Sequence, residues 1–365
     1  MDVLDNPQTV QELDKSSVLE STSLLPDQIE QAWEEVFKID IPLTKLEKVK
    51  NIVVAGMGGS ALGAGIIDSL SFEALDVPLE IIKGYHLPAY ADKNSLAIIS
   101  SYSGNTEETV SCCLEAMRRK CQVFAITTGG QLADLAKKNK LSAYIFRARH
   151  NPSRQPRMGL GYSITAQLAI LSRCKLIRLS EAQIAEAVNF LKQMAPSVTF
   201  DVPSQKNIAK KTALSLRNKA VVLVSSEHLI GATHAFKNML NENSKVFAVR
   251  FSVPEMNHHL LEGLAHPAEN KQLLKFLFLE SAMYDPEIKK RLKITQNVVE
   301  KNGIPCLTLK INGRTRLTQV FETIYLGEFI SCYLSFLYDT DPAPIPWVDY
   351  FKSSLEKYSK AKQSS

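Results

Sequence analysis

The chain has 365 residues, of which 45% are hydrophobic and 22% are charged, and its formal net charge at pH 7 is +5. Because one domain usually has roughly 100 to 200 residues, this length predicts two domains, and the composition argues against extensive disorder. The 43 basic residues are spread along the chain without a basic arm or stripe, which argues against nucleic acid as a partner.

The N-terminal segment and the cysteines bear on the location of the protein. Residues 1–17 contain acids and no apolar signal-peptide core, and no apolar run reaches the roughly 18 residues that span a bilayer. The six cysteines lack CxxC spacing, so neither a disulfide framework nor a zinc site is indicated. We therefore expect a cytoplasmic protein that binds no membrane and no metal.

Strands and helices are predicted to alternate along the first half. A helix begins at Leu25, where apolar residues recur at helical spacing. From residue 51, apolar runs end in Gly- or Ser-rich turns and are followed by helical stretches, which is typical of a parallel sheet with crossover helices. The predicted strands are 51–55, 79–82, 95–100, 123–127 and 143–146. Residues 150–157, which contain two prolines, are predicted to form an irregular loop with the capacity to close over a ligand, before a helix over 162–174.

The second half repeats the order of strand, polar turn and helix, without a residue-level repeat. It is predicted to begin with a helix over 204–219, and a further helix covers 229–241. The predicted strands are 220–225, 246–251, 274–279 and 305–311. The sequence thus predicts an α/β protein with two doubly wound parallel-sheet domains, over residues 1–175 and 176–365.

A glycine-rich turn follows the first predicted strand. Gly56, Gly58 and Gly59 precede a helical stretch that begins near Ser60, an arrangement in which backbone amides face an anion. The spacing GxGGS differs from the dinucleotide pattern GxGxxG, and the second strand ends in IIKGY without the acid that would bind a ribose. A nucleotide-dependent dehydrogenase is therefore disfavoured, while a structural turn and an anion-binding loop stay open as alternatives.

Hydroxyl side chains cluster after the third predicted strand. Ser101, Ser103 and Thr106 follow this strand and lead directly into a helix, so their hydroxyls and the first amides of the helix are able to hold a phosphate. The structural alternative is a helix N-cap, which needs only one hydroxyl. Because the turn supplies several, we favour a phosphate site.

The segments GMGGSALGA and SYSGNTEET, in this order, resemble the sugar isomerase (SIS) domain of phosphosugar isomerases and phosphosugar-binding regulators. LNENSK at residues 240–245 and EMNHH at 255–259 are similar to segments of the bifunctional phosphoglucose/phosphomannose isomerase family. The resemblance covers nearly all of residues 25 to 355. It implies two flavodoxin-like SIS domains, a hexose 6-phosphate substrate, no cofactor, and a homodimer in which each active site receives a histidine from the neighbouring subunit.

The resemblance also implies roles for individual residues. It assigns the base to Glu242, ring opening to His258, enediolate stabilisation to Arg157 and a C-terminal active-site lysine to Lys352. The residues implied in phosphate binding are Gly59, Ser60, Ser101, Ser103 and Thr106. Moving a hydrogen between C1 and C2 of a sugar does require a base, a proton donor and a cation, which these side chains supply.

Each of these residues also has a plainer interpretation. Without the resemblance, Glu242 would be interpreted as a solvated residue at a helix end, and Arg157 and Lys352 as charged residues on the surface. His258, next to a second histidine, would be a surface loop residue or a metal ligand, although adjacent histidines lack the i, i+4 zinc geometry.

Two rival functions follow from the same fold. One is a non-catalytic phosphosugar-binding regulator, which would usually carry a DNA-binding helix-turn-helix, and the acidic N-terminus does not resemble one. The other is an isomerase of a different phosphosugar. Ile345 stands where the family is expected to carry a threonine associated with mannose, so the mannose activity is open at this point.

Overall fold

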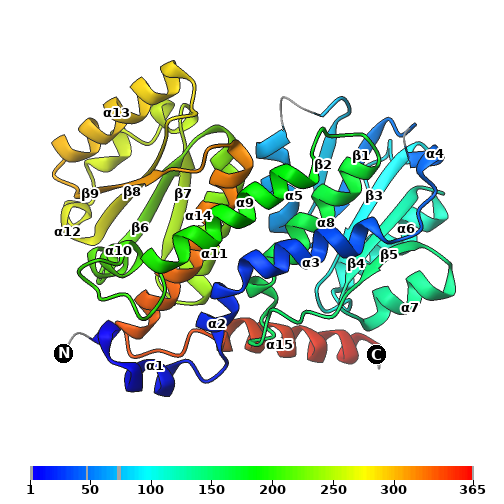
Figure 1. Cartoon of the computed structure of the whole chain (residues 1–365), viewed down its shortest axis with the longest axis horizontal. Helices are drawn as coiled ribbons and strands as arrows, with labels where there is room; N and C mark the ends of the chain where they lie inside the picture. Colours follow the sequence, from blue (N-terminus) through cyan, green and yellow to red (C-terminus); the bar gives the residue numbers. More distant parts are fainter. Residues whose placement is uncertain (1–2, 47, 72–74, 364–365) are drawn as a thin grey trace.

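The computed structural model describes residues 3–46, 48–71 and 75–363. Two parallel β-sheets stand side by side, with helices between them and on their outer faces (Figure 1). The first sheet has five strands in the order β2-β1-β3-β4-β5, and the second has four in the order β7-β6-β8-β9. The first order is that of flavodoxin-like domains, and the second repeats it without the last strand. The predicted fold class is confirmed.

The first sheet is built from strands separated by helices. Its strands are β1 (Asn51–Ala55), β2 (Leu79–Ile82), β3 (Ser95–Ser100), β4 (Gln122–Thr127) and β5 (Ser142–Ile145). The helices of this half are α1 (Pro7–Leu13), α2 (Val18–Ser23), α3 (Leu25–Phe37), α4 (Leu43–Leu46), α5 (Gly59–Ser71), α6 (Glu107–Arg118), α7 (Gly130–Lys138) and α8 (Leu160–Arg173). All five predicted strands are confirmed, with shifts of one residue at β4 and β5. Every residue of β3 is buried because helices cover both faces of the sheet.

The second half has the same alternation. Its strands are β6 (Ala220–Ser225), β7 (Ala248–Ser252), β8 (Leu274–Ser281) and β9 (Cys306–Ile311). Its helices are α9 (Glu181–Met194), α10 (Ile208–Leu216), α11 (Ile230–Glu242), α12 (Asn270–Leu273), α13 (Pro286–Lys301), α14 (Arg316–Phe336) and α15 (Pro346–Gln363). The domain division that we propose from the sequence, after residue 175, falls between α8 and α9.

Several predicted boundaries in this half are shifted, and two starting points are wrong for a clear structural reason. The helix predicted over 204–219 begins only at Ile208, because Asn207 caps it by accepting hydrogen bonds from the amides of Ala209 and Lys210. The strand predicted from residue 246 begins at Ala248, because the chain first turns through Lys245, whose φ is 55°. Both errors come from local backbone geometry that hydrophobic periodicity does not report.

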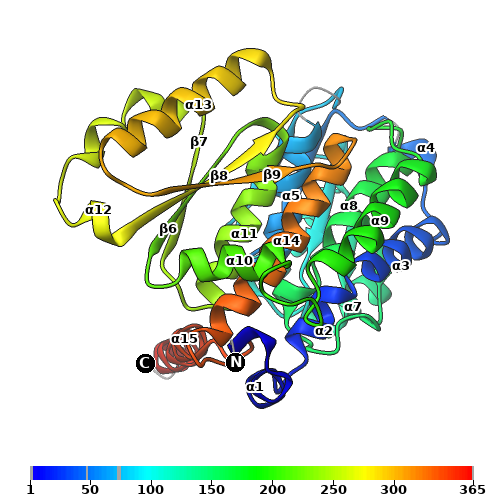
Figure 2. The ribbon, with the colours of Figure 1, turned by 60° about the vertical axis from the view of Figure 1, so that its left-hand side comes forward.

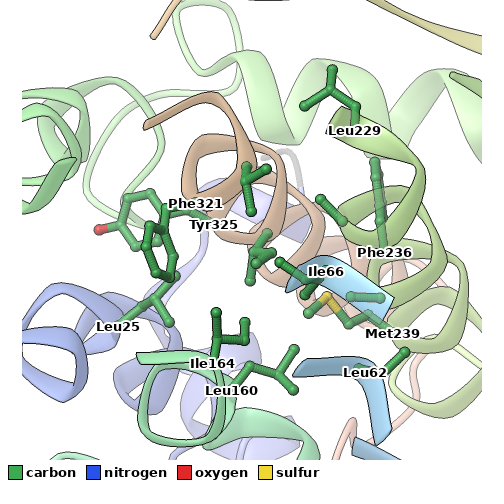
Figure 3. Packing of buried hydrophobic residues seen from close by; sticks show 14 of the residues in the cluster. Leu25, Leu62, Ile66, Leu160, Ile164, Leu229, Phe236, Met239, Phe321 and Tyr325 are labelled. Carbon is green, nitrogen blue, oxygen red and sulfur yellow. The ribbon is translucent and has the colours of Figure 1, made fainter. Parts of the chain in front are cut away.

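The helices between the sheets join the two halves. Figure 2 shows α5 and α8 of the first half beside α11 and α14 of the second. Their apolar side chains form one interior, which includes Leu62, Ile66, Ile164, Phe236 and Phe321 (Figure 3). Helices α5 and α11 approach so closely that a Cβ at Gly231 would lie 2.4 Å from the carbonyl oxygen of Gly65. The close packing of α5 against α11 thereby brings the two halves of the chain into contact.

No helix in the described ranges is long and apolar enough to cross a membrane.

Candidate active site

The hydroxyl turn after β3 is a compact polar cluster. Ser101 Oγ lies 3.0 Å from Thr106 Oγ1, and Ser101 Oγ also accepts a hydrogen bond from the amide of Gly104. Thr106 occupies the N-cap position of α6, but its side chain makes no capping hydrogen bond. The N-cap interpretation of this hydroxyl is therefore wrong. Two hydroxyls instead lie together at a helix N-terminus, where the dipole favours an anion.

The glycine turn after β1 lies against the hydroxyl turn. Ser60 Oγ accepts a hydrogen bond of 3.1 Å from the amide of Tyr102, so the turns after neighbouring strands are tied together. Gly58 has a φ of +52° and open space where a side chain would be, which keeps the backbone of this turn accessible. Ser103 is exposed, and its hydroxyl accepts a hydrogen bond from the amide of Asn105. Ser60 therefore joins the cluster, and Ser103 lies at its rim.

Arg157 enters this site from the loop before α8. A Cβ at Gly59 would lie 3.5 Å from the Cα of Arg157, which places the glycine turn and the arginine segment in contact. The Arg157 side chain is buried, with an exposure of 4% for the residue, so the surface-charge interpretation is wrong. Its Nη2 donates to the carbonyl oxygens of Pro342 and Ala343, at 2.8 and 2.7 Å, and its Nη1 donates to Gln155. Burial lowers the pKa of this guanidinium from its ordinary value.

The loop that carries Arg157 is fixed rather than free to close. Ser153 donates its amide to Ser21 Oγ at 2.9 Å, and Gln28 Nε2 donates to the carbonyl oxygens of His150 and Met158, both at 2.9 Å. These partners belong to α2 and α3. Closure of this loop over a ligand, which the sequence left open, would break these hydrogen bonds to α2 and α3 and is therefore disfavoured.

Glu242 is the last residue of α11 and faces Arg157. Its Oε2 lies 3.9 Å from Nη1 of Arg157, and its side chain is 33% exposed. Burial raises the pKa of this carboxyl above its ordinary value, while the nearby cations Arg157, Lys237 and Lys352 act in the opposite direction. Glu242 is therefore not a solvated helix end, but a partly desolvated carboxylate among cations, a setting frequent at catalytic sites.

The sequence did not reveal that Asn243 and Lys245 support the pair of Arg157 and Glu242. Asn243, fully buried, accepts a 2.6 Å hydrogen bond from Nε of Arg157 and donates to Ser331 of α14. Lys245 donates from Nζ to the carbonyl oxygens of Asn243, Asp341 and Pro342, and burial lowers its pKa to about 8. The only sequence signal for these roles was their adjacency to Glu242.

His258 and Lys352 lie less centrally. His258 ends a short 3₁₀ helix, η5 (Glu255–His258), after β7 and is exposed, and among the described residues no hydrogen bond or ion pair joins it to Glu242 or Arg157. Lys352 is exposed on α15, and its charge acts on Glu242. Within one chain, the structure therefore brings together the arginine, the glutamate and the hydroxyls, but not the histidine.

The neighbouring histidine has a different partner. His259 Nε2 lies 2.9 Å from Oε1 of Glu255, one turn away on the same segment. Within the described residues, no group of three or more histidine, cysteine or acidic side chains is placed to hold a metal ion.

Comparison with known proteins identifies the family. Residues 205–355 match a family described as "Bacterial phospho-glucose isomerase C-terminal SIS domain". A similar structure, a hypothetical protein of Thermus thermophilus, has a TM-score of 0.74 at 17% identity and covers 96% of this chain and 92% of its own, which shows the fold.

Curated relatives match most of the chain. A D-glucosamine-6-phosphate 4-epimerase of Sulfolobus acidocaldarius is 24% identical over 63% of this chain and 68% of its own. The bifunctional phosphoglucose/phosphomannose isomerase of Aquifex aeolicus is 28% identical over 90% of this chain and 95% of its own. That of Caldicellulosiruptor bescii is 33% identical over 93% of this chain and 98% of its own. The chain belongs to the family of bifunctional phosphoglucose/phosphomannose isomerases.

Proposed function

We propose that this protein interconverts glucose 6-phosphate and mannose 6-phosphate with fructose 6-phosphate. The observation that carries the proposal is the pairing of Glu242 with the buried Arg157, whose loop lies against the turn of Gly59 and Ser60. A base and a cation next to a phosphate-binding turn are the groups that an aldose-ketose isomerisation needs. The names of the Caldicellulosiruptor and Aquifex relatives support both hexose phosphates as substrates.

The proposed mechanism passes through a cis-enediol intermediate. Ser60, Ser101 and Thr106 hold the phosphate, with Ser103 at the rim, so that C1 and C2 of the sugar are positioned near Glu242. Glu242 removes the proton from one carbon and returns it to the other, while the hydroxyl proton of the first carbon passes to the carbonyl oxygen of the second, so no cofactor is required. Arg157 stabilises the negative charge of the enediolate, and its own position is held by neutral acceptors that do not cancel its charge.

We further propose a homodimer with shared active sites. His258 would open the sugar ring in the active site of the neighbouring subunit, which is consistent with its exposure and with its lack of contact with Glu242 among the described residues. Helix α15, which carries Lys352, exposes the large side chains of Trp347, Tyr350 and Phe351. Exposed aromatic side chains of this kind are enriched in protein interfaces. A cytoplasmic location also stays a proposal, based on the sequence.

An isomerase or epimerase of another phosphosugar is the second candidate, favoured by the similarity to the Sulfolobus 4-epimerase. A coupled assay separates the candidates. Purified protein is given fructose 6-phosphate, and glucose 6-phosphate and mannose 6-phosphate are measured separately, with fructose 1-phosphate as a control substrate. We expect both 6-phosphates to form. Formation of neither would overturn the proposal in favour of another sugar or a regulator, and formation of glucose 6-phosphate alone would remove the mannose activity.

A further inference from the structure

A second polar cavity lies between the two halves of the molecule. Its volume is about 360 Å³, within the usual size range of small-molecule sites. One wall is formed by residues of α5 and by the end of β2, and the other by the turn from β6 into α11 and by residues of β7 and α14. In the second sheet, the turn after β6 corresponds in strand order to the glycine turn after β1.

One wall of the cavity contains a buried histidine with an unpaired nitrogen. His228 is 1% exposed, and its Nε2 lies 2.8 Å from Oε1 of Gln319. The amide of Gln319 is oriented because its Nε2 donates to the carbonyl of Gly313 and its Oε1 accepts from Ser281. His228 Nε2 must therefore be the donor in this contact. Nδ1 is then an acceptor, and it has no hydrogen-bond partner among the residues that the structure describes.

A second unpaired acceptor lies next to this histidine in the chain. Glu227 accepts a hydrogen bond from the amide of Asp285 through Oε1, whereas its Oε2 is buried and has no hydrogen-bond partner in the described part of the chain. The backbone of Glu227 has a φ of 46°, a conformation that is costly for a residue with a side chain. Asp68 adds a carboxylate on the α5 wall. Buried acceptors without donors are costly, and the hydroxyls of a ligand would satisfy them.

The cavity is also lined by cationic side chains. Lys83, Arg250 and Arg316 line it, and in the described ranges the side chains of Lys83 and Arg250 have no hydrogen bond and no ion pair. Burial lowers the pKa of Arg250, whose guanidinium is half-buried. The first turn of α11 also borders this space, but its amides are already bonded, that of Ile230 to the carbonyl oxygen of Glu227 and that of Gly231 to Ser69 Oγ. The cationic side chains are therefore the groups that attract a phosphate to this cavity.

The cavity is separate from the proposed active site. It is lined by His234, eight residues before Glu242 on α11, and by Gly65 and Ser69, which follow Ser60 on α5. At 1.5 Å of rise per helical residue, the two sites are roughly 10 Å apart along these helices. Neither Glu242 nor Arg157 lines the cavity.

We propose that this cavity is a second binding site for a phosphorylated polyol, which it would hold through the phosphate at Arg250, Lys83 and Arg316 and through hydroxyls at His228 Nδ1 and Glu227 Oε2. The combination of cations with unpaired acceptors matches a ligand that carries both an anion and hydroxyl donors. Inorganic phosphate would interact with the cations but would not supply the polyol hydroxyls for the unpaired acceptors.

Calorimetric titration with D-glucitol 6-phosphate tests the site, because this polyol phosphate has no carbonyl group to isomerise. We expect about two molecules bound per chain in the wild type and about one in Arg250→Ala. Lys83→Met, a change at an exposed position that does not endanger folding, should weaken the same site. Arg291→Ala, an exposed arginine on α13, is the matched control and should bind like the wild type.

The double variant Ser101→Ala/Thr106→Val separates this site from the proposed active site. It should lose one molecule of ligand, and the remaining one should disappear when Arg250→Ala is added. If the double variant binds normally while Arg250→Ala loses ligand, the cavity is supported and the proposed phosphate turn is wrong. Equal stoichiometry in the wild type, Arg250→Ala and Lys83→Met overturns the cavity proposal, whatever the activity of the enzyme.

Discussion

Nη1 of Arg157 lies 3.9 Å from Oε2 of Glu242, and the two residues come from different halves of the chain. Arg157 belongs to the loop before α8, and Glu242 ends α11. The pair is joined by Asn243, which accepts a hydrogen bond from Arg157 and follows Glu242 in the chain. Both charged groups are at least partly desolvated, so their interaction is stronger than that of an exposed ion pair. The contact between the halves therefore forms the candidate catalytic centre.

The cations around Glu242 predict the pH dependence of activity. Burial raises the pKa of Glu242, and Lys237 partly opposes this effect. Because the base must be ionised, kcat/KM should fall with acidification at a higher pH than for an ordinary glutamate. Lys237→Met removes a cation, so the acidic limb should move to still higher pH. Lys211→Met, at an exposed position of α10, should leave the profile unchanged. If the acidic limb of the kcat/KM profile stays in place or moves to lower pH in Lys237→Met, the proposed effect of Lys237 on the pKa of Glu242 is contradicted.

The role of Glu242 as the base predicts a separation of binding from turnover. Glu242→Gln keeps the size of the side chain but removes its capacity to accept the proton, so kcat should fall by about 10²- to 10⁴-fold. Binding of fructose 6-phosphate, measured by calorimetry, should change little, because the phosphate turn is untouched. Glu269→Gln makes the same change at an exposed position outside the site and should remain active. Near-normal turnover in Glu242→Gln would exclude this residue as the base.

The hydroxyl turn predicts a loss of substrate affinity when its hydroxyls are removed. Ser101→Ala and Thr106→Val each remove one member of the 3.0 Å hydroxyl pair. A hydrogen bond to a charged group is worth about 1.5 to 3 kcal/mol, so KM for fructose 6-phosphate should rise about 10- to 100-fold. Ser111→Ala, farther along α6, is the control, since its hydroxyl binds the carbonyl of Tyr85. Unchanged KM in both variants would show that the phosphate binds elsewhere.

The proposed sharing of His258 between subunits predicts complementation. Glu242→Gln and His258→Ala should each form nearly inactive homodimers. After subunit exchange, half of the dimers are mixed, and each mixed dimer contains one site with both residues intact. Activity should recover to about a quarter of the wild-type level. If each active site uses its own histidine, no intact site forms, and activity stays at the level of the separate variants.

A carboxyl group in the interior predicts an unusual dependence of stability on pH. Glu328 of α14 is fully buried, and within the described ranges neither of its carboxyl oxygens has a hydrogen-bond partner. Burial raises its pKa well above the ordinary value. The native state therefore binds a proton that the unfolded state releases, and stability falls as the pH rises above the unfolded pKa. The loss is about 1.4 kcal/mol for each pH unit up to the folded pKa.

Replacement of this carboxyl should remove that dependence. Glu328→Met should unfold at a higher temperature than the wild type at pH 8, and the difference should shrink at pH 5. Glu262→Met, at an exposed position, should show no such trend. Thermal unfolding followed by circular dichroism at the two pH values measures the effect. A variant that is less stable than the wild type at pH 8 would mean that Glu328 makes a favourable interaction in the native state.

Much of the fold was predictable because its signals are local. The strands β1, β2, β3 and β6 match the predicted residues, since each is an apolar run bounded by turn residues. Parallel strands bring their carboxyl ends to one edge, and a hydrogen bond from the amide of Tyr102 to Ser60 Oγ ties the turns after β1 and β3 together there. The order of the strands followed from the resemblance rather than from periodicity.

The sequence by itself determined the type of each element and the hydroxyls at the end of β3, because periodicity and turn chemistry are properties of neighbouring residues. Only the tertiary structure decided that Arg157 is buried, that Asn243 holds it, and that the charged residues around His228 enclose a cavity. Burial and the pKa of Glu242 depend on segments far apart in the chain, which meet where α5 packs against α11. The physical reason is that desolvation is set by what surrounds a charge, and no local pattern records those surroundings.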